Sequence, residues 1–174
     1  ITTTKTDSAR KTLGVIGWAT PAKDAAWALD TLTALTDSGE EWRLRLVGAE
    51  PRINGTAGEA AYAADVMAQI ASLGSRVELV GQVTDIPAEL ENIGIIISSS
   101  TRESFHYGLA EGVASGALPV VRNWPSLAPF GGAHGTWPDE WIVDTPEEAA
   151  QRILTTVPES SQIDHLPDAQ ESAR

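Results

Sequence analysis

The chain has 174 residues, of which 24 are acidic and 12 are basic, so its formal net charge is −12 at pH 7. This negative balance, with no block of Lys or Arg, argues against nucleic acid and anionic membranes as partners, and the lack of cysteine excludes disulfides and thiolate metal sites. A chain of this length buries about 70% of its unfolded surface in a single core, so we expect one domain and no transmembrane segment.

Short Leu-rich or β-branched runs alternate with amphipathic stretches, a pattern typical of repeated βα units in a parallel sheet. We predict strands at residues 13–17, 42–47, 77–80, 93–98, 118–122 and 141–143. The expected fold is therefore a three-layer, Rossmann-like α/β domain with a parallel sheet of about six strands flanked by helices. We place this domain at residues 13–157, after a flexible segment at 1–12 and before a polar tail at 158–174.

Two helices are predicted in the first half of the chain. The first has Thr20 as its N-cap and Pro21 as its first helical residue, which puts Lys23 in the first turn. The second is expected to carry Ala64, Met67, Ala68 and Ala71 on one apolar face.

Three helices are predicted in the second half. A short one follows Asp85 and Pro87, and another begins near Tyr107. The last opens with "TPEE", in which Thr145 and Glu148 have the spacing of a capping box. The connection at residues 123–140 is rich in Pro, Gly and Trp, and a long irregular loop of this kind is usually functional.

The segment "SSSTRESFHYGLAEG" follows the fourth predicted strand, at the sheet edge where open parallel sheets bind ligands. A helix start near Tyr107 offers free N–H groups to an anion, and Gly108 would let a phosphate approach closely. Glu103 and Glu111 stand eight positions apart, and carboxylates of this kind accept hydrogen bonds from vicinal hydroxyls of a ribose or sugar. The spacing alone leaves open that both carboxylates are solvated surface groups.

Lys23 is the candidate cation after the first strand. In the first turn of a helix its charge opposes the helix dipole, so a compensating anion is expected. Either a bound ligand or the neighbouring Asp24 can supply that anion. Gly17 marks the sharp exit from the strand in both cases.

The run "ESFHYGLAEGVASGALPVV" resembles the E-x7-E segment of retaining glycosyltransferases with the GT-B architecture, of the family-4 type. The positions that keep this pattern are Glu103, Phe105, Glu111, Ala114, Gly116, Pro119, Val120 and Val121. Upstream, "LGVIGWATPAKD" resembles the family's Gly-Arg-five-residues-Lys loop, with Gly17 and Lys23 in place. The resemblance covers about residues 13–157.

The resemblance implies a donor site for a nucleotide-diphosphate sugar of the UDP or GDP type. Glu103 would be the catalytic carboxylate that holds the donor sugar, Glu111 would hold the ribose, and Lys23 would contact the diphosphate. The other implied donor-site residues are Gly17, Gly81, Gln82, Arg102, His106, Tyr107, Gly108 and Leu109, with Gly81 and Gln82 beside the base. The family requires no metal, and no cofactor is expected.

The family resemblance also sets the expected context. The chain would be the C-terminal, donor-binding half of a cytoplasmic enzyme that transfers a hexosyl-type sugar to an unknown acceptor with retention of configuration. The N-terminal half would supply the acceptor site, so the chain alone would be inactive.

The sequence departs from the family pattern at the site itself. Trp18 replaces the family's Arg, and either Arg102 or Arg122 could substitute for it or be a surface charge. His106 replaces a Gly, where it could donate to phosphate or block the site. Trp124 is expected to seal the cleft. These departures leave a second hypothesis open, a non-catalytic Rossmann-like relative that serves as an interaction or regulatory module.

Overall fold

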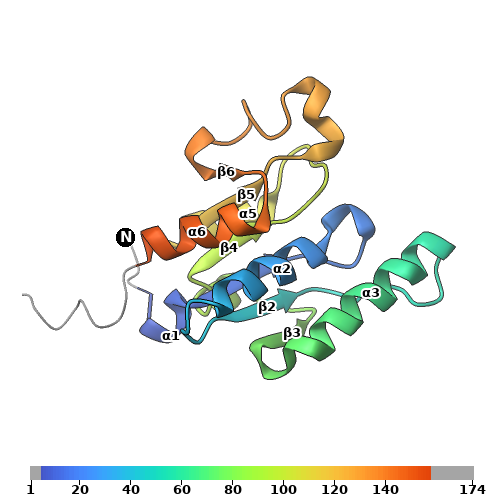
Figure 1. The fold of residues 1–174 in the computed structure, drawn as a ribbon, viewed down its shortest axis with the longest axis horizontal. Helices are drawn as coiled ribbons and strands as arrows, with labels where there is room; N and C mark the ends of the chain where they lie inside the picture. Colours follow the sequence, from blue (N-terminus) through green and yellow to red (C-terminus); the bar gives the residue numbers. More distant parts are fainter. Residues whose placement is uncertain (1–4, 158–174) are drawn as a thin grey trace, which may run out of the picture.

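The computed structural model describes residues 5–157, and six parallel strands form one sheet between two layers of helices (Figure 1). The strands are β1 (Thr12–Ile16), β2 (Arg43–Val47), β3 (Val77–Gly81), β4 (Ile95–Ser98), β5 (Leu118–Arg122) and β6 (Ile142–Val143). Their order is β3-β2-β1-β4-β5-β6, the doubly wound order of a Rossmann fold. The predicted fold class is confirmed.

Helices on opposite faces of the sheet complete the three layers. One face carries α2 (Ala25–Thr36), α3 (Ala57–Leu73) and α6 (Pro146–Thr156), and the other carries α4 (Ile86–Leu90) and α5 (Tyr107–Ala114). A short helix, α1 (Asp7–Arg10), precedes β1. The 3-10 helices within residues 5–157 are η1 (Pro21–Lys23), η2 (Gly74–Arg76), η3 (Pro125–Phe130) and η4 (Asp139–Trp141).

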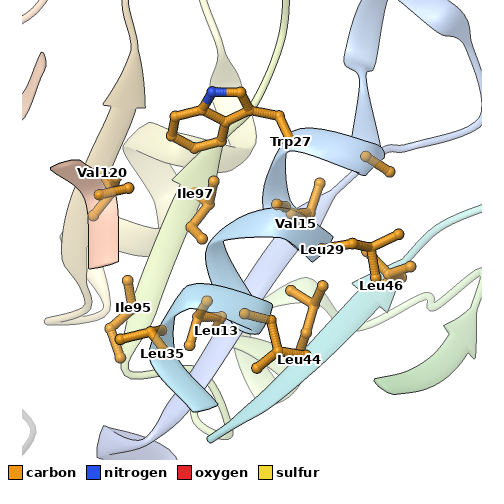
Figure 2. Close-up of a cluster of buried hydrophobic side chains, with 14 of the residues drawn as sticks. Leu13, Val15, Trp27, Leu29, Leu35, Leu44, Leu46, Ile95, Ile97 and Val120 are labelled. Atoms are coloured by element: carbon orange, nitrogen blue, oxygen red, sulfur yellow. The ribbon is translucent and has the colours of Figure 1, made fainter. Parts of the chain in front are cut away.

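The larger core lies between the sheet and α2, α3 and α6. Alternate residues of a strand face the same side, so Leu13 and Val15 of β1 and Ile95 and Ile97 of β4 all point toward α2 (Figure 2). The intervening residues, such as Ile96, face α4 and α5 and form a second core. Burial on both faces explains why the central strands are continuously apolar.

Part of the segment at residues 1–12, which was predicted to be flexible, has regular secondary structure. Residues 7–10 form α1, where Ala9 is buried, and β1 already begins at Thr12. Lys5 also connects this segment to the helix layer of α4 and α5, because its Nζ donates to the carbonyl of Leu90 at 2.6 Å and to the Ser115 hydroxyl at 3.0 Å. The predicted tail at 158–174 lies outside the described residues.

The start of α2 also differs from the prediction. Pro21–Lys23 form the 3-10 helix η1, Thr20 makes no capping hydrogen bond, and α2 begins only at Ala25. Between them Asp24 adopts a left-handed conformation with φ 42°, which interrupts the helix. Lys23 therefore lies before α2 rather than in its first turn, and the predicted conflict with the helix dipole does not arise.

The remaining helix predictions were mostly confirmed. Asp85 caps α4, and Thr145 and Glu148 form the predicted capping box of α6. The predicted apolar face of α3 is wrong: its buried residues are Ala63, Val66 and Ile70. The loop at 123–140 is partly ordered by η3 and η4. Within residues 5–157 we find no helix with the length and apolar character to cross a membrane.

Candidate functional site

The candidate site lies where the direction of the sheet connections reverses. From β1 the chain crosses to α2 on one face, whereas from β4 it crosses to α5 on the other face. The loops after these two neighbouring strands therefore diverge at the carboxyl ends of the strands, the position at which doubly wound sheets bind ligands, and we call this position the crevice. Lys23 follows β1, and Glu103 follows β4.

Lys23 and Glu103 form an ion pair across this crevice. The Lys23 ammonium donates to Oε1 of Glu103, and the same oxygen accepts from the Ser100 hydroxyl at 2.8 Å. The Lys23 and Glu103 side chains are 30% and 14% exposed, so the pair is largely shielded but still reachable. Within residues 5–157, Oε2 of Glu103 has no hydrogen-bond partner. One face of the carboxylate is thus available to a ligand.

The environment of Glu103 keeps it ionised. Burial alone would raise the pKa of Glu103, but the hydrogen bonds from Lys23 and Ser100, together with the charge of Lys23, outweigh burial and lower it. Such a carboxylate accepts hydrogen bonds and stabilises positive charge at neutral pH. It is not suited to act as a general acid there.

Hydrogen bonds fix the Lys23 loop to the loop after β4. The Ser99 hydroxyl donates to the Lys23 carbonyl at 2.7 Å, and the Thr101 N–H donates to the Ala22 carbonyl at 2.8 Å. These bonds hold the Lys23 backbone beside the segment that carries Glu103. The ion pair is therefore built on two loops that are themselves connected.

Arg122, at the end of β5, holds the same region from the other side. Its guanidinium pairs with Asp24, donates to the Ser99 carbonyl at 3.2 Å and lies 5.9 Å from the ring centre of Trp27. These contacts show that Arg122 braces the Lys23 loop, and they leave Asp24 paired with Arg122 rather than with Lys23. Arg102 is exposed and has no ion pair within residues 5–157, so it is the better candidate for the missing cation.

Trp18 occupies the core rather than the crevice. Its side chain is fully buried, and its carbonyl accepts from the Tyr62 hydroxyl at 2.9 Å, which in turn accepts from the N–H of Ala25 at 3.1 Å. The substitution of Arg by Trp thus removes a charge from the site without filling it. Gly17 has φ 78°, a conformation that favours glycine, as expected for the sharp exit from β1.

His106 is turned inward, beneath the start of α5. The residue is 5% exposed; Nδ1 lies 2.8 Å from the Ser98 hydroxyl and Nε2 lies 3.4 Å from the Ile16 carbonyl. Because a carbonyl only accepts, the neutral ring carries its proton on Nε2 and accepts from Ser98. Burial and the charge of Lys23 lower the pKa of His106, and the charge of Glu103 and the Ile16 carbonyl only partly offset them. Both ring nitrogens are occupied, and the ring does not block the crevice.

The start of α5 presents backbone N–H groups to the crevice. His106 makes no side-chain cap, so the N–H groups of Tyr107 and Gly108 have no acceptor in the described part of the chain, while that of Leu109 bonds to the His106 carbonyl at 3.1 Å. The helix also places the positive end of its dipole there. These groups suit an anion such as a phosphate.

The role predicted for Gly108 requires a correction. A Cβ at this position would lie 2.7 Å from Cβ of Ile16, and one at Gly112 would lie 2.6 Å from Cγ1 of Ile96. The missing side chain thus faces the sheet rather than a phosphate. The two glycines let α5 pack closely on β1 and β4, which brings its first turn to the crevice.

Glu111 lies apart from Glu103, on the exposed side of α5. It lines a groove of about 360 Å³ between α4 and α5, whose walls are Ile86, Pro87, Leu90, Glu91, Glu111, Ala114 and Ser115. This groove is mostly apolar with two carboxylates on its rim. Gly81 is the last residue of β3, and Gln82 begins the loop that leads to α4. The Gly81 carbonyl accepts from the Gly48 N–H at 2.8 Å, and Gln82 is exposed.

Several residues of the site were not predicted. The sequence showed only a run of small hydroxyl residues at the end of β4. In the structure their hydroxyls bond to His106 (Ser98), to the Lys23 carbonyl (Ser99) and to Glu103 (Ser100). Tyr62, from the middle of α3, reaches the loop after β1, and no local sequence signal indicates that contact. Trp124 is buried in the second core.

Comparison with known proteins identifies a family. Residues 10–157 match the family model described as glycosyl transferases group 1. A search of curated protein sequences found no significant match.

Solved structures of glycosyltransferases share the fold. HepE from Anabaena, in complex with UDP and glucose, has a TM-score of 0.68 at 22% identity over 88% of this chain and 40% of its own. A mutant of TarM from S. aureus, in complex with fondaparinux, alpha-GlcNAc-glycerol and UDP, has a TM-score of 0.67 at 16% identity, over 92% of this chain and 31% of the TarM chain. The C-terminal domain of LpcC, a glycosyl transferase group 1 family protein from Francisella tularensis, has a TM-score of 0.64 at 15% identity, over 86% of this chain and 76% of the LpcC chain. The chain thus spans only two fifths or less of HepE and TarM.

Proposed function

Since the chain belongs to the group 1 glycosyl transferase family, we propose that its crevice between β1 and β4 binds the diphosphate and sugar of a nucleotide-sugar donor. The observation that carries this proposal is the Lys23–Glu103 pair, which stands beside the uncapped N–H groups of α5. A cation, free N–H groups and a carboxylate with one free oxygen are the groups that a diphosphate and a sugar need.

The proposed donor lies across the top of α5. The diphosphate contacts Lys23 and the N–H groups of Tyr107 and Gly108, with Arg102 close in sequence as a second cation. The donor sugar binds Oε2 of Glu103. The ribose binds Glu111, and the base lies toward the apolar groove and the loop of Gly81 and Gln82. The complexes of HepE and TarM with UDP support a uridine nucleotide.

The full protein is proposed to transfer a hexosyl group with retention of configuration. No general acid is available at the pair, because the pKa of Glu103 is lowered and Lys23 is engaged with it. Glu103 instead orients the sugar and stabilises the positive charge that develops at its anomeric carbon. Because the chain spans 40% of HepE, we propose that the rest of the protein supplies most of the acceptor site.

Isothermal titration of the chain with UDP, GDP and ADP tests this proposal. We expect one of them to bind with one-to-one stoichiometry and Lys23→Met to weaken its binding by about 10-fold to 150-fold, since a charged hydrogen bond contributes about 1.5–3 kcal/mol. Lys11→Met is the matched control, because Lys11 pairs with Glu40 at 3.1 Å, away from the crevice. Equal losses in both variants, or no binding to any nucleotide, would refute the donor site.

The absence of binding would favour the second candidate, a non-catalytic relative. The observation behind it is the burial of Trp18, which leaves the loop after β1 with one cation instead of two. A module of this kind would keep the fold and the Lys23–Glu103 pair as structural features only.

A further inference from the structure

Four aromatic side chains form a continuous row beside the crevice, and we call Phe105, Tyr107, Trp137 and Trp141 the aromatic platform. The rings of Phe105 and Tyr107 meet edge to face with centres 5.2 Å apart, and the rings of Phe105 and Trp137 lie 5.0 Å apart. Trp137 stacks on Trp141 at 5.9 Å. The row connects the loop after β4 with the segment before β6.

The platform has a buried base and an exposed end. Trp137 is 9% exposed and packs in the second core, whereas Phe105 is 45% and Tyr107 is 75% exposed. The other exposed large apolar residues of the described chain are Ile53, Leu79 and Phe130, which take part in no ring contact. Single exposed residues need no explanation, but two exposed rings that contact each other edge to face on a buried base form a preorganised surface.

The platform adjoins the groups assigned to the donor sugar. Phe105 is two positions after Glu103, and Tyr107 is the first residue of α5. The exposed end of the platform therefore borders the crevice, whereas the groove at Glu111 lies between α4 and α5. A molecule on the platform would stand next to the donor sugar rather than next to the nucleotide base.

The size of the platform indicates the kind of ligand. An aromatic side chain offers about 200 Å², so the exposed fractions of Phe105 and Tyr107 correspond to about 240 Å². Stable protein interfaces need about 800 Å² from each partner, several times more. An area of this size instead matches a small, flat ligand.

We propose that the aromatic platform binds one face of a neutral hexose ring in the acceptor. The axial C–H bonds of a pyranose make one ring face apolar and slightly positive, and the faces of aromatic rings carry the complementary negative charge. The net charge of −12 and the exposed Asp139 and Glu140 before Trp141 disfavour an anionic sugar. This inference rests on the proposed function, because it assigns an acceptor subsite beside the donor sugar.

Saturation-transfer NMR of the chain with methyl α-D-glucopyranoside, galactopyranoside and mannopyranoside tests the inference. We expect transfer to the ring protons of at least one sugar, strongest on one face, and a decrease of about fivefold in Tyr107→Ala and Phe105→Ala. Tyr107→Phe keeps the ring and should keep the signal. Phe130→Ala removes an exposed ring outside the platform and should also keep it. Circular dichroism verifies that each variant is folded.

The same samples separate this inference from the proposed function. A wild-type chain that binds UDP but shows no transfer to any of the three sugars, or equal transfer in Tyr107→Ala, would overturn the acceptor subsite alone. Loss of both UDP and sugar binding would overturn both proposals. A dimer seen by light scattering in the wild type and absent in Tyr107→Ala would mean that a second copy covers the platform, which also overturns the inference.

Discussion

Removing the charge of Glu103 should strengthen the binding of UDP. In the free chain Glu103 engages the ammonium of Lys23, which we assign to the diphosphate. Whether Lys23 leaves Glu103 or donates to both groups, a carboxylate beside a diphosphate repels it. Glu103→Gln retains the size of the side chain and an acceptor for Ser100, so it changes mainly the charge.

The expected gain follows from the exposure of the pair. Fully exposed pairs contribute about 0–1 kcal/mol, and removal of one partner of a fully buried pair costs about 3–5 kcal/mol. With exposed side-chain fractions of 30% and 14%, the Lys23–Glu103 pair lies between these limits, and we take its interaction free energy as about 1–2 kcal/mol. UDP should therefore bind Glu103→Gln about 5 to 30 times more tightly than the wild type.

The donor sugar should respond in the opposite sense. Oε2 of Glu103 is assigned to a sugar hydroxyl, so the additional affinity of UDP-glucose over UDP should decrease in Glu103→Gln. Isothermal titration with both ligands measures the two effects, and Glu41→Gln, at an exposed position before β2, is the matched loss of charge. The reasoning is refuted if UDP binds Glu103→Gln equally or more weakly, or if Glu41→Gln shows the same gain.

Three further predictions concern the framework of the site. Arg122→Met should lower the free energy of unfolding by about 1–3 kcal/mol in urea, because it leaves a partly buried carboxylate without its partner, and should weaken UDP binding; unchanged stability would contradict the bracing role. The lowered pKa of His106 means that the unfolded chain binds a proton more readily than the folded one. The neutral His106 ring therefore contributes fully to the free energy of unfolding above about pH 6.5, and this contribution is lost as the pH falls below that value. In His106→Gln the midpoint of urea unfolding should depend less on pH below about pH 6.5. A pH dependence equal to that of the wild type would contradict the lowered pKa of His106. Gly108→Ala should cost about 1–3 kcal/mol because its Cβ meets Ile16, whereas the control Gly58→Ala, with open space at its Cβ, should be neutral or stabilising; equal effects would show that α5 is not closely packed.

The architecture was predictable because it depends on patterns that repeat along the chain. Continuous apolar runs indicated buried parallel strands, and the alternation with helices then left few topologies. The position of Lys23 and Glu103 at the carboxyl ends of strands followed from the same reasoning, whereas the neighbouring position of β1 and β4 was seen only in the structure. The α3 face was mispredicted because small Ala residues mark several faces of that helix equally well, and Val66 and Ile70 determined which one is buried.

The direction of individual side chains was not predictable. Trp18 and His106 both occupy positions at the crevice, yet the first enters the core and the second bonds to Ser98 and Ile16 beneath α5. Arg122 was a candidate ligand for phosphate until its contact with Asp24 was seen. Each outcome depends on a partner that lies far away in the sequence, which no local pattern specifies.

A UDP titration of the 15N-labelled chain, followed by amide chemical shifts, shows directly whether the crevice between β1 and β4 holds the diphosphate of a nucleotide. We expect the largest changes at the N–H groups of Tyr107 and Gly108, with further changes around Lys23. Largest changes at the opposite edge of the sheet, or at residues of α3 and α6, would contradict it.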